Sequence, residues 1–446
     1  MKKHNKSSWF KPSKFIYLIF LFSLLLLVLI HFVISPQANP ESVENKLPVT
    51  IYFADNISLA QREIIKRFNS EYNGKIKVEL VNLPLEKFSS AERKQLFTKY
   101  LRSESNQIDV FSIDQVWIPR FAKWSEDLRK FFPDEIEQNI IGEALTPCIY
   151  NNRLVAAPLY IDMGVMYYRS DLISELPNSA ILKRTLEKSI TWEEFIELGE
   201  KYFSDSERFF FFSADNYEGL ICFFMEIYSA QNYNSELPIE IGSERTLSSF
   251  KFIQSLINEN KLTPAEVTNM QETEVLISYL DSDGIFIRGW PNSFNFFEPS
   301  EEHKKKIEKI KIVPLPHFKG KPKSYTFGGW NLMLSKFSSN KKEAAEFIKF
   351  CLSEESQLLM YEMQGFLPST KSFYFSDDNS TDSGKIEFFN TNFGYGIYRP
   401  RVENYTLFSS ILSGSLNKVL RQEIGTDEAI LDAEKEFELL SVSNEK

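Results

Sequence analysis

The chain has 446 residues, which is enough for two or three domains with buried cores. Its formal charge is −10, yet the first forty residues hold five lysines and no acidic residue, so the remainder carries −15. Such an acidic body would repel phosphate backbones, and we expect no nucleic-acid partner. Aromatic residues make up 15% of the chain, which excludes a largely disordered protein.

Cysteine, histidine and motif content excludes most familiar enzyme classes. The three cysteines lie far apart without CxxC spacing, which predicts buried free thiols rather than a zinc site or a disulfide framework. Beyond the N-terminal stretch only His303 and His317 remain, and no HExxH, GxSxG, phosphate-loop or GxGxxG motif occurs. We therefore expect neither a metal nor a cofactor. A glycosidase that uses only carboxylates survives these absences.

The N-terminus has the pattern of a membrane anchor. Residues 15–34 form an apolar run long enough to span a hydrocarbon core, after a basic segment at 1–14. The lysines predict a cytoplasmic N-terminus and an extracytoplasmic body, joined by a polar tether at 35–46. A cleavable signal peptide is the alternative, but its apolar core is usually shorter and is followed by a small-x-small site. We expect a single-pass, uncleaved signal anchor.

The first part of the body alternates between strand and helix patterns. Residues 49–54 are an apolar, β-branched and aromatic run, and 75–83 alternate as in a strand. A helical pattern at 59–72 separates them, and another helix at 90–102 leads to a strand at 108–113 and a loop from Asp114. This order predicts a parallel sheet.

Further strands and helices continue the α/β pattern. Thr191 and Glu194 form a capping box that opens a helix, and a helix at 341–362 ends before Gly365. Short strands are predicted at 154–158, 163–168, 284–287, 310–315 and 330–335.

Three tryptophans lie beside turn-forming or charged residues rather than inside apolar runs: Trp117, Trp290 and Trp330. Asp114 and Trp117 follow a predicted parallel strand, where loops line the ligand crevice of open α/β sheets. A carboxylate accepts hydroxyl hydrogen bonds, and an indole packs on the C–H face of a pyranose, so the pair suits a sugar. The alternative for each tryptophan is an ordinary half-buried core residue.

Other loops repeat this chemistry. Tyr160 and Asp162 form a second aromatic–carboxylate pair, although a plain surface loop explains them equally well. Gly329 precedes Trp330 and would let the backbone approach a ligand closely. Arg399 offers a rigid bidentate donor, unless it is solvated or belongs to a structural ion pair.

Taken in order, these segments resemble the extracellular solute-binding proteins of carbohydrate ABC importers, of the maltose- and trehalose-binding type. The resemblance runs from Val49 to Leu440. Each motif alone is only weakly specific for the family, whereas the order of the motifs along the chain is specific. The segments that carry it are the opening strand and helix, Asp109-Val110 leading to Asp114 and Trp117, Pro158 to Leu172, Thr191-Trp192-Glu193-Glu194-Phe195, the Gly284 strand ending at Trp290, Gly328-Gly329-Trp330 and Gly365-Phe366-Leu367-Pro368.

The resemblance implies an α/β, two-lobe periplasmic-binding-protein-like fold of type II. Each lobe would be a mainly parallel sheet flanked by helices, with a hinge of crossing segments. By analogy the first lobe comprises 47–160 and 327–370, and the second comprises 161–326 and 371–446.

The resemblance also implies the binding residues. Asp114 and Asp162 would accept hydrogen bonds from sugar hydroxyls, and Trp290 and Trp330 would stack on the rings. The supporting contacts would come from Trp117, Tyr160 and Arg399.

The implied function is a membrane-tethered, non-catalytic receptor that binds an oligosaccharide or related polyol and delivers it to an ABC permease, with the ATPase as an indirect partner. A family member held by a hydrophobic anchor departs from the usual cleaved or lipid-anchored forms. Alternatives are a ligand-binding sensor that serves a signalling protein, or a receptor for another small polar solute. A glycosidase would need Asp114 and Asp162 as its carboxylate pair.

Overall fold

A computed structural model describes residues 19, 21–27, 47–83, 90–203, 208–231, 239–295, 297–375 and 383–444. The chain divides into two units, residues 1–48 and 49–446. Residues 21–27 are helical, whereas the rest of the expected anchor at 15–34, apart from Ile19, lies outside the described residues, as do the segments 1–14 and 35–46. In the described part of the chain, no helix has the length and apolar character needed to cross a membrane.

The helices of the second unit are mostly short and separated by strands or turns. The first group is α2 (Leu59–Glu71), α3 (Ser90–Arg102), α4 (Ile118–Phe121), α5 (Glu135–Asn139), α6 (Gly142–Leu145), α7 (Ser170–Ser174), α8 (Ser179–Lys188), α9 (Trp192–Phe203) and α10 (Glu218–Gln231). The second group is α11 (Glu244–Asn258), α12 (Glu272–Asp281), α13 (Glu301–Ile307), α14 (Lys341–Cys351), α15 (Glu354–Gln364), α16 (Lys371–Phe375), α17 (Ser383–Asn392), α18 (Tyr405–Leu420) and α19 (Thr426–Asn444).

Several helix boundaries follow the signals in the sequence. Thr191 and Glu194 make the predicted reciprocal capping bonds at the start of α9. Gly365 ends α15 with a φ of +69°, a left-handed conformation that favours glycine. The single helix predicted at 341–362 was wrong, because Ser353 caps a new helix by accepting a hydrogen bond from the Ser356 N–H.

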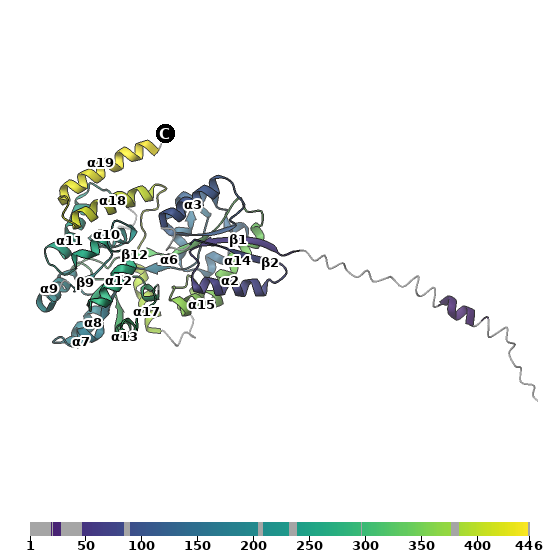
Figure 1. Cartoon of the computed structure of the whole chain (residues 1–446), viewed down its shortest axis with the longest axis horizontal. Coiled ribbons are helices and arrows are strands. Elements are labelled where there is room, and N and C mark those ends of the chain that lie inside the picture. Colours follow the sequence, from purple (N-terminus) through teal and green to yellow (C-terminus); the bar gives the residue numbers. More distant parts are fainter. Residues whose placement is uncertain are drawn as a thin grey trace, which may run out of the picture. The chain divides into compact units, whose positions relative to one another are not determined.

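The first sheet has five strands in the order β2-β1-β3-β13-β6. The strands are β1 (Val49–Asp55), β2 (Ile76–Asn82), β3 (Val110–Asp114), β13 (Trp330–Leu334) and β6 (Ala157–Pro158). β1 pairs in parallel with β2 and β3, as predicted, whereas β13 is antiparallel to both β3 and β6. The helices α2, α14 and α15 contact one another, and α2 and α14 also contact this sheet (Figure 1).

The second sheet has four strands in the order β11-β8-β10-β9. The strands are β8 (Val165–Arg169), β9 (Phe210–Phe211), β10 (Phe286–Gly289) and β11 (Ile310–Val313). β8 is antiparallel to both of its neighbours, and only β9 and β10 pair in parallel. The expectation of mainly parallel sheets is confirmed for β1, β2 and β3 and is wrong at β8 and β13, because these strands arrive from the other sheet without a crossover helix and run against their neighbours.

A third, smaller sheet is built from segments that connect the other two. Its strands, in the order β14-β12-β7, are β14 (Gly396–Ile397), β12 (Tyr325–Gly328) and β7 (Asp162–Met163). The chain passes from β6 through β7 to β8, and later from β11 through β12 to β13. These crossing strands pair with each other, with Phe327 opposite Met163 and Gly328 opposite Asp162. The predicted crossing segments are thus present as a hydrogen-bonded sheet.

The core beside the second sheet is strongly aromatic. Trp192, at the start of α9, packs against Phe195, Phe210 and Phe252 with ring centroids 5.1 to 5.9 Å apart. The helices α10, α11, α18 and α19 pack together as one group (Figure 1). The three cysteines are free and buried, as predicted.

Candidate functional site

The two acids predicted to bind the ligand, Asp114 and Asp162, meet where the first sheet joins the crossing strands. Asp114 is the last residue of β3 and lies opposite Trp330, the first residue of β13. Asp162 begins β7 and lies opposite Gly328, two residues before Trp330. Strand register therefore brings Asp114, Asp162 and Trp330 together, although they are far apart in the sequence.

Trp117 joins this group through a short helical turn. The segment after Asp114 is a 3-10 helix, Gln115–Trp117, rather than the predicted loop, and the Asp114 carboxylate caps it by accepting from the Val116 N–H at 3.2 Å. The Trp117 ring meets Trp330 edge-on, with centroids 6.4 Å apart and planes at 87°. Both indoles are half-buried.

Gly329 has a structural reason to be glycine. Its φ is +130°, and a Cβ atom would lie 2.5 Å from the Tyr160 carbonyl oxygen. The close approach is therefore to the crossing segment of the chain itself, with Leu159 N–H donating to the Trp330 carbonyl at 2.9 Å. The half-buried Tyr160 ring packs on Phe366 at 4.4 Å.

Trp290 follows β10 and approaches the same place from the second sheet. Its ring carbons would lie 3.1 Å from a Cβ added to Gly328, the residue opposite Asp162. The Trp290 carbonyl accepts from the Tyr167 hydroxyl at 2.8 Å, and its N–H donates to Ser293 Oγ at 2.8 Å. These bonds fix the backbone that carries the half-buried indole.

An arginine packs on Trp290. The guanidinium of Arg288 lies 4.1 Å from the Trp290 ring centroid and is bound by Glu226 of α10 at 2.8 Å. The side chains of Arg288 and Glu226 are only 4% and 3% exposed, so the ion pair is fully desolvated. Sequence reasoning missed Glu226, although a single acid inside the apolar run of α10 was a usable signal.

Arg399 connects two acidic side chains. Its Nη2 lies 2.8 Å from Asp114 Oδ1, and its Nη1 lies 2.7 Å from Glu218 Oε1 at the start of α10. Glu218 also accepts from the Ser409 hydroxyl at 2.6 Å and from the Tyr405 hydroxyl. The structural ion pair considered for Arg399 therefore exists, and it links β3 of the first sheet to helices packed around the second. Glu218 was not predicted.

Asp162 carries an unusual carboxyl group. Its Oδ1 is buried and has no hydrogen-bond partner among the described residues. Burial, with a further contribution from Asp114, raises the pKa of Asp162 from 3.8 to about 8, while Arg288 opposes the shift. At neutral pH the group is therefore mainly protonated in the folded protein and is able to donate as well as accept.

Because the pKa of Asp162 is raised, the stability of the folded protein depends on pH through this group. Between about pH 4 and about pH 8 the folded state holds a proton that the unfolded chain has lost, so this group's contribution to stability falls as pH rises through the window. Asp162→Asn does not titrate, and its urea midpoint should rise relative to that of the wild type between about pH 5 and about pH 8. Urea unfolding followed by tryptophan fluorescence tests this. A constant difference between the two proteins would contradict the assignment.

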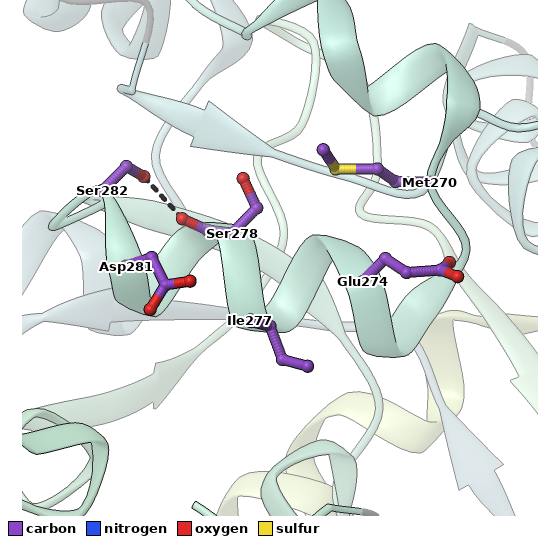
Figure 2. A pocket seen from close by; sticks show the side chains of 6 residues that line it. All are labelled: Met270, Glu274, Ile277, Ser278, Asp281 and Ser282. Carbon is purple, nitrogen blue, oxygen red and sulfur yellow. Dashed lines mark hydrogen bonds between the residues drawn. The ribbon is translucent and has the colours of Figure 1, made fainter. Parts of the chain in front are cut away.

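Two surface hollows lie elsewhere. One runs along α12 and is lined by Met270, Glu274, Ile277, Ser278, Asp281 and Ser282 (Figure 2). The second, on the first sheet's side, is lined by Tyr52, Val81, Tyr100, Asn106, Gln107, Ile108, Asp109, Ser339 and Asn340. Neither contains a predicted site residue. The candidate site is instead a packed cluster of polar and aromatic side chains at the crossing strands.

Comparisons with known proteins identify the family and the fold. The family model described as "Bacterial extracellular solute-binding protein" matches residues 63–386. A probable ABC transporter-binding protein of Deinococcus radiodurans is 27% identical over 314 residues, covering 68% of this chain and 71% of that protein.

Solved structures show the same fold. Maltose-bound MalE3 of T. maritima superposes with a TM-score of 0.75 at 27% identity, covering 88% of this chain and 100% of the other. The ribitol complex of an ABC transporter solute-binding protein from Agrobacterium radiobacter K84 has a TM-score of 0.70 at 21% identity, covering 88% and 99%.

The chain belongs to the bacterial extracellular solute-binding protein family. It has the two-lobe fold of that family, and it is a solute-binding protein rather than an enzyme, so the glycosidase alternative is set aside.

Proposed function

We propose that this protein binds a carbohydrate between its two lobes. The observation that carries the proposal is the convergence of two carboxyl groups and two indoles, from Asp114, Asp162, Trp290 and Trp330, at the strands that connect the sheets. Hydroxyl groups require acceptors of this kind, and sugar rings stack on indoles. The maltose complex of the MalE3 relative favours the same class of ligand.

The lobe boundaries are part of this proposal. The first lobe would comprise 47–160 and 327–370, and the second 161–326 and 371–446. Sheet membership supports the division, because the chain changes sheets at β7 and at β12. Closure would be a hinge motion at the crossing strands, stabilised by contacts that the ligand makes to both lobes. Tyr160 and Trp117 would support the ring contacts, with Gly329 shaping the crossing segment and Arg399 holding Asp114.

We further propose that the protein is tethered to the membrane and delivers its ligand to an ABC permease. The apolar run at 15–34, preceded by lysines, supports an anchor with the body outside the cytoplasm. The name of the Deinococcus relative supports the transporter partner.

A thermal-shift screen tests the proposed function. The purified chain is heated with mono- and oligosaccharides, polyols, amino acids and short peptides, and a ligand that binds only the folded state raises the melting temperature. We expect a saccharide to do so, and an excess of about 100 times Kd adds about 2.7 kcal/mol of stability. A shift with an amino acid or peptide and none with any saccharide would contradict the carbohydrate assignment.

A further inference from the structure

Basic side chains gather around Trp117 on the first-lobe side of the site. Lys94 of α3 places its Nζ 5.7 Å from the Trp117 ring centroid, and Arg93 lies 4.6 Å from the Trp330 ring centroid. Arg120 of α4 is close enough to Lys94 to repel its charge. Arg399 binds Asp114, the residue opposite Trp330, so four cationic side chains lie in this part of the site.

The nearby carboxylates are already engaged by two of these four cations. Asp55 lies 3.8 Å from Arg93, and Asp114 and Glu218 both bind Arg399. These pairs thus engage three carboxylates of the described residues, and Asp162 adds little negative charge because burial raises its pKa to about 8. These cations lie together although the chain beyond residue 40 carries −15.

Lys94 is the cation with the poorest compensation. Its residue is only 7% exposed, and its Nζ donates to the neutral hydroxyl of Thr406 in α18 at 2.6 Å. Burial and Arg120 lower the pKa of Lys94 to about 8, and Glu218 only partly opposes this. Among the described residues, no carboxylate pairs with Lys94 or with Arg120. Buried lysines are almost always paired, so this one is placed to meet an external anion.

Two guanidinium groups also carry a buried N–H group from which no described residue accepts a hydrogen bond. The Nε–H groups of Arg120 and Arg399 are buried without a hydrogen-bond partner in the described part of the chain, and Arg399 is only 3% exposed. Guanidinium and ammonium groups are the side chains that bind carboxylates and phosphates best.

We propose that the ligand is an acidic saccharide, one that carries a carboxylate or a phosphate or sulfate ester, with its negative charge beside Lys94. This inference rests on the proposed carbohydrate binding and specifies its class. The stacking surfaces and carboxyl groups would recognise the sugar ring, while the anion would supply the charge that Lys94 lacks. Because Lys94 belongs to α3 and its partner Thr406 to α18, the anion would bind where the lobes approach each other.

Isothermal titration of the full chain, purified in mild detergent, tests the charge requirement. The probes are uronic-acid disaccharides, their methyl esters, the parent neutral disaccharides and the corresponding sugar phosphates. We expect an acid to bind at least about tenfold more tightly than its ester, a difference of about 1.4 kcal/mol. The uronic acids and the sugar phosphates distinguish the two sources of negative charge.

The other outcomes contradict either the acidic specificity alone or carbohydrate binding as well. Neutral sugars or esters that bind as tightly as the acids would overturn the acidic specificity and leave carbohydrate binding intact. A complete lack of binding to all saccharides would overturn both.

Two matched variants assign the effect to the charge of Lys94. Lys94→Met keeps the length of the side chain and removes the cation, so the preference for acid over ester should disappear while affinity for the ester is kept. Thr406→Val removes the hydroxyl partner and leaves the cation, so the preference should persist. Loss of the preference in Thr406→Val, or its retention in Lys94→Met, would contradict the role of the Lys94 charge.

Discussion

Replacing Arg288 by methionine should lower the free energy of unfolding by about 3–5 kcal/mol, the usual cost of leaving one member of a buried ion pair alone. Glu226 would then be a carboxylate without its cation in a site where it is 3% exposed. Its remaining contact, the N–H of Thr326 at 3.2 Å, does not supply a charge. The arginine is expected to matter because burial already raises the pKa of Glu226 and Arg288 is the main influence that lowers it.

Urea unfolding of Arg288→Met at neutral pH measures this loss. The double variant Arg288→Met with Glu226→Leu removes both charges, and it should recover much of the stability, since apolar replacements of a whole buried pair are often neutral. Additive losses in the double variant would show that the two charges do not stabilise each other, contrary to the structure.

Replacing Trp290 by alanine should weaken saccharide binding by about 2 kcal/mol, or roughly thirtyfold, as truncation of a central aromatic contact usually does. The change removes the indole held between Arg288 and the crossing strand at Gly328, while the bonds of its backbone to Tyr167 and Ser293 can still form. Trp330→Ala should have a similar effect, because its ring is the counterpart on the first lobe and is backed by Arg93 at 4.6 Å.

Titration calorimetry with the saccharide found in the thermal-shift screen measures both variants. Tyr202→Ala is the control, since it removes an aromatic ring from α9 that is 37% exposed and is not part of the cluster at the crossing strands. Unchanged affinity in both tryptophan variants would place the ligand elsewhere, whereas a loss in Tyr202→Ala would indicate a general defect.

The sequence was most informative where local pattern determines structure. The strands at 49–55 and 76–82 show period-two alternation or an apolar run, and the α9 cap follows a standard signal. Strand direction in the second sheet was not predictable in this way, because it depends on β8 entering directly from the crossing strand β7. The break between α14 and α15 at Ser353 could have been predicted, because a serine followed by two glutamates is a typical helix start.

The candidate site was predictable only in part. The order of motifs pointed to Asp114, Asp162, Trp290 and Trp330. Strand register brings the two acids to Trp330, and Trp290 approaches them at Gly328. Their charged neighbours come from helices such as α3 and α10, and a helical pattern does not say which strand end a side chain will reach. Arg93, Lys94 and Glu218 therefore required the structure. Glu226, the single acid in its apolar run, gave a signal that was overlooked.

A crystal structure of the protein with its bound saccharide tests the central claim most directly. The account predicts electron density for the sugar at the crossing strands, with hydroxyl groups bonded to Asp114 and Asp162 and rings against Trp290 and Trp330. Density for the sugar in the hollow along α12 or in the hollow beside Tyr52, with the crossing-strand site unoccupied, would contradict it.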